Sequence, residues 1–335
     1  MEDAVTPNHP DAPRPELSVV IPMYNEEENA PETLRLAAEA LDRAGVDYEL
    51  VPVDDGSADG TWSALQQAAR ANARVRPAGY RVNFGRGRAL KTGFAQARGR
   101  IVCAIDADLS YSPDHILRML ETLRKRQEVD IVLASAYMPG GRTEGVPFWR
   151  LLLSRYGNHL LSAAMPGKIH TITCVVRAYR REVLERLDIE SDGKEIHLEI
   201  LAKALSLGYR ITEIPAVLRA RRKGKSKAKV KSTIASHLMF SFIERPILLF
   251  GFLGLFATAM AFLAGGYIVY LWQSGVLNPV RPLMTLMTLL FLGGLQLISF
   301  GLLAMLVGIN RKELYRIERQ NREILMRLDK PDEPR

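Results

Sequence analysis

Two carboxylates follow a short apolar run in the stretch IVCAIDADLSYSP at residues 101–113. Ile101 to Ile105 has the profile of a strand buried on both faces, and it stops at Asp106 and Asp108. In an extended or tightly turning segment, residues i and i+2 point the same way, so both carboxylates can face one point. Oxygen ligands of this kind suit Mg²⁺ or Mn²⁺, which usually enter a site together with a substrate phosphate. Two solvated turn aspartates are the alternative.

The residues after this pair predict a helix. Pro113 suits a first helical position, and the helix is expected to run through about Arg126. A strand, paired carboxylates at its carboxyl end and then a helix is the order in which α/β sheets build ligand sites.

Composition sets limits on the rest of the chain. Its 335 residues can hold two domains, or one domain and something else. The only cysteines, Cys103 and Cys174, suggest no disulfide framework and indicate a reducing compartment. Residues 1–16 are polar and proline-rich without an apolar core, which predicts a disordered tail rather than a signal peptide.

Two earlier stretches repeat the strand–turn–helix design. The run LSVVIP at 17–22 predicts a buried strand, followed by a helix that opens with the glutamates 26–28, where acidic groups complement the helix dipole. A second strand ends at Asp54 and Asp55, and a helix is expected from Thr61. Either aspartate can accept hydrogen bonds from a base or a ribose.

A glycine-rich basic stretch, RVNFGRGRALKTGFAQARG at 81–99, precedes and enters a predicted helix at 87–97. Such a turn at a helix start suits a diphosphate, although a tight turn and helix packing explain its glycines equally well. Strands alternating with helices predict an α/β fold with a mainly parallel, doubly wound sheet. The glycines are Gly85, Gly87 and Gly93, and the basic residues are Arg81, Arg86, Arg88 and Lys91.

Taken together, the motifs resemble those of family 2 glycosyltransferases of the GT-A fold, and among them the polyprenyl-phosphate hexose synthases of the dolichol-phosphate mannose synthase type. The resemblance runs from about Leu17 to Lys227, and a two-helix tail occurs in a subgroup of these enzymes. The motifs are VIPMYNEEEN (20–29), VDDGS (53–57), RVNFGRGRALKTGFAQARG (81–99), DADLSYSP (106–113), GVPFWRLLLSRYGN (145–158), TITCVVRAYRREVL (171–184), EIHLEILAKALSLGYRITEIP (195–215) and RRKGKSK (221–227).

The resemblance implies a nucleotide-sugar site and a metal. Asp106 and Asp108 would hold a divalent metal, Mg²⁺ or Mn²⁺, against the donor diphosphate, and Ala107 would line the site by its backbone. The residues implied to contact the base and ribose are Pro22, Tyr24, Glu26 and Asp55, with Asp54 close by.

The resemblance also implies two phosphate sites and a sugar contact. Arg150 and Ser154, which lie one helical turn apart, would meet the acceptor phosphate. Arg221 and Lys227 match the R-x-x-G-x-S-K loop that closes over the donor phosphates. Glu199 matches an acidic position near the sugar hydroxyls, and an exposed helix carboxylate is the alternative.

One position departs from the family pattern. Ala136 stands two residues after a predicted strand, where the family usually has an arginine facing the phosphates. Its loss removes a bidentate phosphate donor that alanine cannot imitate. Arg142, Arg155 and Arg177 are candidates to replace it. Alternatively, acceptor or donor specificity has moved, or turnover is slow.

The chemistry of the implied reaction requires no general base. A lipid monophosphate has a second pKa near 6, so it is largely dianionic and nucleophilic at neutral pH. The protein then has to place the anomeric carbon in line and neutralise the departing diphosphate. His197, the histidine near a site motif, is interpreted as a packed or surface residue.

Beyond the catalytic domain, expected at 17–227, the composition changes sharply. The stretch 219–231 holds eight basic and no acidic residues, and an amphipathic run follows at 232–246. A nucleic-acid patch or localisation signal is the alternative for the basic stretch alone. Beside an apolar segment it favours a juxtamembrane helix at 228–246 that binds anionic head groups, and no nucleic acid.

Two uncharged segments, 247–273 and 283–309, each exceed the ~20 residues that span a bilayer core. They predict two transmembrane helices, with an interfacial aromatic belt at one end; a buried core helix is the alternative for either. The loop between them has one basic residue and both outer flanks are basic, which places both termini and the catalytic domain in the cytoplasm. The belt residues are Tyr267, Tyr270 and Trp272.

The tail 310–335 is expected to be helical, with apolar residues at alternating spacings of three and four. This pattern predicts a short coiled-coil seam with one polar member, through which copies of the chain could associate; a solvated or membrane-surface helix is the alternative. The seam residues are Leu314, Ile317, Asn321, Ile324 and Leu328.

The resulting interpretation is a membrane-anchored, metal-dependent, inverting glycosyltransferase. It would move a hexose from a nucleotide diphosphate sugar, of the GDP-mannose or UDP-glucose type, to undecaprenyl or dolichyl phosphate for extracytoplasmic glycosylation. A glycosyltransferase for another lipid or a polysaccharide, and a transporter or flippase subunit with a vestigial domain, are the alternatives.

Overall fold

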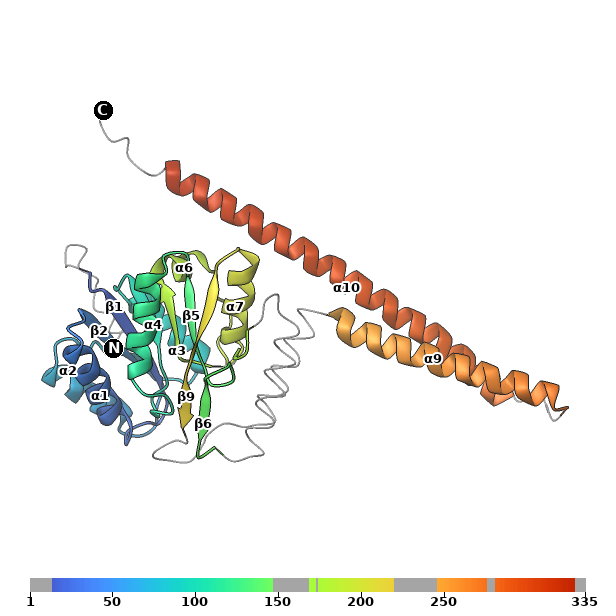
Figure 1. Cartoon of the computed structure of the whole chain (residues 1–335), viewed down its shortest axis with the longest axis horizontal. Coiled ribbons are helices and arrows are strands. Elements are labelled where there is room, and N and C mark those ends of the chain that lie inside the picture. Colours follow the sequence, from blue (N-terminus) through green and yellow to red (C-terminus); the bar gives the residue numbers. More distant parts are fainter. Residues whose placement is uncertain (1–13, 147–168, 173, 220–245, 276–280, 329–335) are drawn as a thin grey trace. The chain divides into compact units, whose positions relative to one another are not determined.

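The computed structural model describes residues 14–146, 169–172, 174–219, 246–275 and 281–328. Contacts within the chain divide it into two compact units, Met1–Ser236 and His237–Arg335. The first contains the sheet and its helices, and the second contains two long helices (Figure 1). Each unit is described by itself.

The first unit is built on a seven-stranded sheet in the order β3-β2-β1-β4-β7-β5-β8. All neighbours pair in parallel except β7, which is antiparallel to both β4 and β5. The prediction of a mainly parallel α/β sheet is therefore confirmed. The strands are β1 Leu17–Met23, β2 Tyr48–Asp55, β3 Ala78–Tyr80, β4 Ile101–Ala104, β5 Ile131–Ser135, β7 Arg177–Arg180 and β8 Ile211–Pro215, and a separate parallel pair is β6 Arg142–Glu144 with β9 Val217–Arg219.

Helices cover both faces of this sheet. Alternate residues of β1 point to opposite faces, and Leu17, Val19 and Ile21 pack in one apolar cluster with residues of α1 and α4. α3 lies on the other face, where a Cβ added at Gly93 would come within 2.2 Å of Val20 Cγ1. The helices of this unit are α1 Ala30–Arg43, α2 Thr61–Ala71, α3 Arg86–Gln96, α4 Asp114–Lys125, α6 Arg181–Arg186 and α7 Ile196–Ser206.

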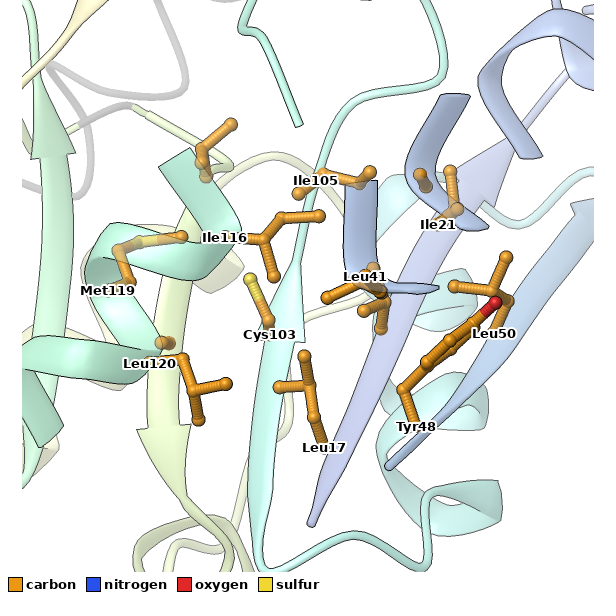
Figure 2. Packing of buried hydrophobic residues seen from close by; sticks show 14 of the residues in the cluster. Leu17, Ile21, Leu41, Tyr48, Leu50, Cys103, Ile105, Ile116, Met119 and Leu120 are labelled. Carbon is orange, nitrogen blue, oxygen red and sulfur yellow. The ribbon is translucent and has the colours of Figure 1, made fainter. Parts of the chain in front are cut away.

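Figure 2 shows how this apolar cluster holds the central strands in place. Leu41 of α1 and Ile116 of α4 lie over Leu17 and Cys103. All four side chains are buried, so a one-residue slip in register would turn each strand's buried set to the wrong face.

The first helix begins later than the sequence predicts. α1 starts at Ala30, so the glutamates 26–28 lie in the turn before it and not in its first turn. Pro31 fits the first helical turn because its fixed φ suits a helix and it has no N–H to satisfy there. The other predicted helix and strand boundaries within this sheet agree with the structure to within one residue.

The second unit is a pair of helices, α9 Pro246–Gln273 and α10 Arg281–Leu328. Within them, Phe250–Gln273 and Pro282–Asn310 are long and apolar enough to cross a membrane, which confirms the prediction of two long apolar helices. The predicted helix at 228–246 lies outside the described residues up to the start of α9.

Two glycines let α9 and α10 approach closely. A Cβ at Gly254 would come within 2.6 Å of the Gly294 carbonyl oxygen, and one at Gly294 within 2.4 Å of Thr258 Oγ1. Small residues that permit such contact are typical of packed helices in membranes. Thr258 satisfies its own hydroxyl by donating to the Gly254 carbonyl at 2.8 Å.

At the amino ends of the strands, a buried carboxylate ties three segments together. Glu49 of β2 accepts hydrogen bonds from the Ser18 hydroxyl at 2.6 Å, from Arg76 Nη1 at 2.7 Å, and from the Arg98 amide and Nε at 2.6 and 2.9 Å. Burial raises the pKa of Glu49, but these hydrogen bonds outweigh burial and hold the pKa below its ordinary value.

We predict that Glu49→Gln destabilises the protein by about 2–4 kcal/mol, because the substitution replaces one accepting oxygen by an NH2 group and removes the negative charge that faces two partly buried guanidinium groups. Since the folded-state pKa is lowered, the contribution of Glu49 is present above about pH 4.3 and is lost as the pH falls through the folded pKa. Urea unfolding at pH 7 and pH 4 measures both effects.

Glu39→Gln is the control for this prediction. Glu39 pairs with Arg35 on the surface, so its substitution should change stability by less than about 0.5 kcal/mol. Equal effects of the two substitutions would contradict the role assigned to Glu49.

Candidate active site

The Asp106 and Asp108 carboxylates lie just beyond the carboxyl end of β4, next to the carboxyl end of β1. Val20 of β1 pairs with Ala104, the last residue of β4. β2 lies on the other side of β1, so the strand order reverses between β1 and β4. Ligands of open α/β sheets bind at such a switch point.

The two carboxylates alternate with buried residues in the segment 106–109. Asp106 and Asp108 are partly exposed, whereas Ala107 and Leu109 are buried. The Ala107 carbonyl accepts a hydrogen bond at 2.7 Å from the hydroxyl of Thr33 in α1. The backbone between the two aspartates is therefore tied to α1, while both carboxylates remain partly accessible.

Each carboxylate has a neighbour that limits its position. Arg86 Nη2, at the start of α3, lies 3.5 Å from Asp106 Oδ1. Asp108 Oδ1 accepts from the Ser110 amide at 3.0 Å and also from the Ser110 hydroxyl. Asp108 is thus held by Ser110 in the turn after β4, whereas Asp106 lies beside the guanidinium of Arg86 from α3.

The turn after β1 is fastened to the turn after β2. Asn25 adopts the left-handed conformation with φ 52°. Its amide donates to Ser57 Oγ at 2.8 Å and its side-chain oxygen accepts from the Ala58 amide at 2.8 Å. Tyr24 is exposed beside this turn, and Glu26 accepts a hydrogen bond from Asn29. The chain thereby brings Tyr24 and Glu26 to the same sheet edge as the β2 aspartates.

Asp55 organises the loop that follows β3. Its carboxylate accepts from the Tyr80 hydroxyl at 2.7 Å, from Asn83 Nδ2 at 2.9 Å, and from the Phe84 and Gly85 amides at 3.1 Å. These protein donors occupy both of its oxygens in a buried position. The direct contact to a base or ribose that the resemblance implies would therefore have to share a carboxylate that already holds this loop.

Asp54 is the second buried aspartate at the end of β2. One oxygen accepts from the Ser57 amide at 3.0 Å. Burial raises the pKa of Asp54, and the nearby Asp59 and Asp55 act in the same direction. The negative charge of an ionised Asp54 is thus disfavoured by burial and by the neighbouring carboxylates.

The glycine-rich turn at the start of α3 packs against the loop at 190–194. A Cβ at Gly87 would lie 2.5 Å from the Asp192 carbonyl carbon, and Gly85 has φ 106°, so neither position accepts a side chain easily. The Arg88 amide donates to the Asp192 carbonyl at 3.1 Å, and Lys91 Nζ lies 2.6 Å from Asp192 Oδ1. The glycines thus permit close backbone approach, and the segment that approaches is the 190–194 loop.

Glu199 of α7 holds this 190–194 loop. Its two oxygens accept from the Glu190 and Ser191 amides at 2.8 Å each, and Lys203 Nζ lies 2.7 Å away. The side chain is buried, so the alternative of an exposed helix carboxylate is wrong. Burial raises the pKa of Glu199, yet the hydrogen bonds outweigh it and leave the pKa below its ordinary value.

Arg177 does not replace the arginine missing at Ala136. It is fully buried in β7, and its guanidinium donates to the carbonyls of Cys174 at 2.7 Å, His197 at 2.8 Å and Ile172. Three of its five N–H groups are bound by backbone carbonyls and the whole side chain is buried, so this guanidinium is not presented to a phosphate.

Ala136 itself and the two other candidate replacements, Arg142 and Arg155, are considered in turn. Ala136 is buried directly after β5, one residue closer to the strand than predicted, because β5 continues through Ser135. Arg142 is exposed at the start of β6. Arg155 lies outside the described residues.

Four predicted phosphate ligands also lie outside the described residues: Arg150, Ser154, Arg221 and Lys227. The strand that precedes Arg221 and Lys227 is β9, which ends at Arg219. His197 is buried in α7, in agreement with its interpretation as a packed residue.

β9 is pinned to the segment that follows the aspartates. The Val217 amide donates to His115 Nε2 at 3.2 Å, and the Arg219 amide donates to the Ser110 carbonyl at 2.8 Å. Because Nε2 accepts, Nδ1 carries the proton and donates to the Ser112 carbonyl at 2.8 Å. Burial lowers the pKa of His115, which favours this neutral form.

Two residues of the candidate site, Lys194 and His115, were not predicted from the sequence. Lys194 lies near Arg86, and its pKa is lowered by burial and by that guanidinium. The Ser-Asp-Gly run at 191–193 is a turn signal that could have drawn attention to this loop. His115 is one histidine inside a helical pattern, and no local signal marks its contact with β9.

The donor set at the switch point suits a hard divalent ion. Within the described parts of the chain, no group of three or more His, Cys, Asp or Glu side chains could hold a metal ion. Asp106 and Asp108 supply two carboxylates, and Mg²⁺ is typically bound by one or two carboxylates together with waters and substrate phosphates. The pair therefore fits a metal that arrives with a phosphorylated substrate.

Comparison with known proteins agrees with this geometry. Residues 18–188, slightly more than half of the chain, match the family model described as "Glycosyl transferase family 2". The chain belongs to glycosyl transferase family 2. The switch-point aspartates and the turns after β1, β2 and β3 all lie inside the matched region.

Relatives of this family 2 glycosyltransferase share about a third of its residues. It is 34% identical over 219 residues to dolichol-phosphate mannosyltransferase of Pyrococcus furiosus, covering 64% of this chain but only 60% of that relative. It is 33% identical over 216 residues to polyprenol monophosphomannose synthase of Mycolicibacterium smegmatis, covering 62% and 79%. A third relative, undecaprenyl-phosphate 4-deoxy-4-formamido-L-arabinose transferase of Erwinia tasmaniensis, is 30% identical over 251 residues, covering 73% and 74%.

Solved structures show that this glycosyltransferase has a GT-A-like fold. Glucosyl-3-phosphoglycerate synthase from Mycobacterium tuberculosis, in complex with phosphoglyceric acid, is similar with a TM-score of 0.55 at 21% identity, covering 69% of this chain and 80% of that one. The same enzyme in complex with Mn²⁺, UDP and phosphoglyceric acid has a TM-score of 0.52 at 22% identity, covering 68% and 78%. At these identities the likeness shows the fold alone.

We predict that His115→Phe destabilises the first unit by about 1–3 kcal/mol, because the partly buried Val217 amide loses its acceptor. His115→Gln, which keeps an acceptor at the end of the side chain, should recover most of this loss. Urea unfolding of the three proteins at pH 7.5 measures the difference.

Acidification gives a second readout of the same contact. The folded pKa of His115 is lowered, so its contribution to stability is present above about pH 6.5 and is lost as the pH falls through the folded pKa. The charged groups facing it are Asp114, Arg118 and Arg219. Stability of the Gln variant should fall less between pH 6.5 and pH 5; an identical fall in both proteins would contradict the assignment.

Proposed function

We propose that this glycosyltransferase transfers a hexose from a nucleotide diphosphate sugar to a polyprenyl phosphate. The observation that carries the proposal is the set of relatives at 30–34% identity, all three named for transfer to a polyprenol or polyprenyl phosphate. The paired carboxylates at the switch point of the sheet support it, because a donor diphosphate with its metal requires such a site.

The two aspartates are the proposed metal ligands. Asp106 and Asp108 would hold Mg²⁺ or Mn²⁺, whose positive charge would stabilise the diphosphate as it departs. Arg86 lies beside Asp106 and adds a fixed positive charge at the start of α3. The start of α3 adds the positive end of a helix dipole, and its Arg88 amide already donates to the Asp192 carbonyl.

The acceptor phosphate supplies the nucleophile in the proposed reaction. A polyprenyl monophosphate is largely dianionic at neutral pH, so one of its oxygens attacks the anomeric carbon without a general base. The carbon–oxygen bond to the diphosphate breaks as the new one forms on the opposite face, and the anomeric configuration inverts. The protein contributes alignment of the two substrates and neutralisation of their charge.

The remaining site residues keep the roles that the family resemblance implies. Arg150 and Ser154 are proposed to bind the acceptor phosphate, and Arg221 and Lys227 the donor phosphates. Glu199 is proposed to act near the sugar chiefly by holding the 190–194 loop, since both of its oxygens already accept protein hydrogen bonds. The nucleotide contacts are proposed for Pro22, Tyr24, Glu26, Asp54, Asp55 and the Ala107 backbone.

The vacancy created by Ala136 has one described candidate replacement. Arg142 is exposed six residues further along the chain, at the start of the strand pair β6–β9. We propose that Arg142 supplies the missing positive charge, because Arg177 is fully engaged in the interior.

The two apolar helices are proposed to anchor the enzyme in a membrane that also carries its acceptor. Both helices are long enough to span a bilayer. The Lys and Arg residues near them are concentrated in the outer flanks and not in the connecting loop. By the positive-inside rule, the catalytic unit and both termini would face the cytoplasm, where nucleotide sugars are made. The basic stretch 219–231 would bind anionic head groups beside the first span.

The function is tested by incubating the purified full chain with undecaprenyl phosphate and a panel of radiolabelled nucleotide sugars. Label should enter the lipid phase with at least one donor, and EDTA should abolish the transfer. Transfer only to a glycerolipid acceptor would overturn the proposed acceptor, and full activity in EDTA would remove the metal from the reaction.

Asp108→Asn should abolish this transfer without unfolding the protein, because the amide oxygen can still accept from Ser110 while the charge needed for the metal is lost. Asp114→Asn is the matched control: this aspartate is exposed at the start of α4, and its substitution should leave turnover within about twofold. Circular dichroism of both variants checks that the fold is retained.

We predict that substitutions at the acceptor-phosphate site impair transfer, whereas substitutions at the donor-phosphate site impair donor binding. A charge-assisted hydrogen bond to phosphate contributes roughly 1.5–3 kcal/mol, or about ten- to a hundredfold in kcat/KM if it is felt in the transition state. Arg150→Ala should lose that factor in transfer yet bind the donor with near-normal affinity, whereas Lys227→Ala should weaken donor binding directly. Calorimetry with the donor and kinetics with varied lipid phosphate measure both; the reverse pattern would invert the assignment.

A further inference from the structure

α10 is one uninterrupted helix of 48 residues that continues well beyond the apolar span (Figure 1). The span ends at Asn310, and the helix continues to Leu328 through a sequence rich in Arg and Glu. Span and tail therefore present parts of a single helical surface, so a stripe in one can continue directly into the other.

A seven-residue repeat runs along this surface from the middle of the span to the end of the helix. The tail seam predicted from the sequence, extended towards the span at the same spacing, meets two further carboxamides and a glycine among apolar residues. We name these residues the α10 seam: at heptad position a, Gly293, Phe300, Val307, Leu314, Asn321 and Leu328; at position d, Gln296, Leu303, Asn310, Ile317 and Ile324.

The α10 seam is not the surface that packs on α9. α9 contacts α10 at Gly294 and Ile298, where Gly294 is buried. Seam side chains are instead exposed: 61% for Leu303, 63% for Val307 and 65% for Leu314. Lipid can cover exposed apolar groups inside a membrane, but Leu314 and Ile317 lie beyond the span, where exposure to water is unfavourable.

Gln296 indicates which kind of partner covers the α10 seam. It lies midway between Pro282 and Asn310, the ends of the span, and its side chain is exposed. Its carboxamide makes no hydrogen bond to any residue that the structure describes. An unsatisfied carboxamide in the hydrocarbon core of a bilayer is costly, because neither water nor lipid tails can bind it there.

A carboxamide carries both donors and an acceptor, so an identical carboxamide at the same depth satisfies it. Two copies of one chain cross the membrane in the same direction, which brings Gln296 opposite Gln296 when their α10 helices lie in parallel. Asn310 repeats this self-complementary arrangement at the end of the span, and Asn321 occupies the same repeat in the tail. Gly293, one turn away, has nothing within 4 Å of an added Cβ and permits close approach.

We propose that α10 is the self-association helix of this enzyme, and that copies of the chain pack in parallel along the α10 seam from Gly293 to Leu328. This inference rests on the membrane-spanning part of the proposed function and is independent of glycosyl transfer. Self-association would hold the catalytic units of neighbouring copies on the same side of the membrane.

Cysteine cross-linking in native membranes tests the seam with adjacent residues. Leu303→Cys lies in the seam, and Leu302→Cys is a matched control, since Leu302 is also exposed but lies about 100° away around the helix. On mild oxidation the Leu303→Cys protein should form a disulfide-linked dimer at least tenfold more than the Leu302→Cys protein. Wild-type protein, whose Cys103 and Cys174 are both buried, should form none.

A second pair repeats the comparison near the end of the span, with Val307→Cys in the seam and Ile309→Cys outside it. Equal cross-linking at seam and control positions, or a product containing a different protein, would overturn the proposal. Extraction with alkaline carbonate is run on the same membranes. Release of the chain would show that it does not span, which overturns the proposal at its foundation, whereas retention with equal cross-linking refutes the seam alone.

Gln296→Leu tests the carboxamide itself. Interhelical hydrogen bonds in membranes have effects of about 0.6–2 kcal/mol, so self-association in lipid vesicles should weaken roughly three- to thirtyfold. Energy transfer between labelled full-length chains, measured as the protein is diluted in lipid, gives the dissociation constant. Thr288→Val is the control, because that hydroxyl already donates to the Met284 carbonyl in its own helix at 3.0 Å. An unchanged constant in Gln296→Leu, or an equal change in Thr288→Val, would contradict the proposed pairing.

Discussion

Parallel pairing of β1 with β2 and with β4 is the constraint on which the rest of the site depends. Parallel strands end at the same edge of a sheet. β2 ends in Asp54 and Asp55, and polar residues follow within two positions of the ends of β1 and β4. The register places Met23 opposite Asp54 and Val20 opposite Ala104, which brings Tyr24 and the later aspartates to one edge. Both faces of these strands are buried, so a one-residue slip would exchange the side chains that pack on the two faces of the sheet, and this keeps the register.

Most of the buried charge at this edge holds loops in place. Asp55 binds the turn after β3, and Glu199 binds the 190–194 loop, each through two or more backbone amides. For Glu199 these hydrogen bonds outweigh burial and hold the pKa below its ordinary value. The loops around the candidate site are therefore set before any ligand arrives, which is the condition for preorganised electrostatic stabilisation. Asp106 and Asp108 differ from these groups, since they remain partly exposed at the end of their strand.

Arginines in this enzyme show why residue type alone does not assign a role. Arg177 lies in a family motif, yet its guanidinium is enclosed by three backbone carbonyls and serves the packing of β7. Arg86 lies in a turn whose glycines have an ordinary packing explanation, yet it is placed beside Asp106. The difference arises from contacts between segments far apart in the sequence, and no local pattern encodes them.

The sequence alone determined the α/β class, the strand–carboxylate–helix order at Asp106 and Asp108, and the two apolar helices. These follow from periodicity, chain length and turn residues, which act over a few neighbouring positions. Only the tertiary structure decided that Asp55 and Glu199 are already bound by loop amides, that His115 holds β9, and that α1 begins after the glutamates. Each of these depends on which distant donors reach a buried group, and that is set by the packing of the whole sheet rather than by any local preference.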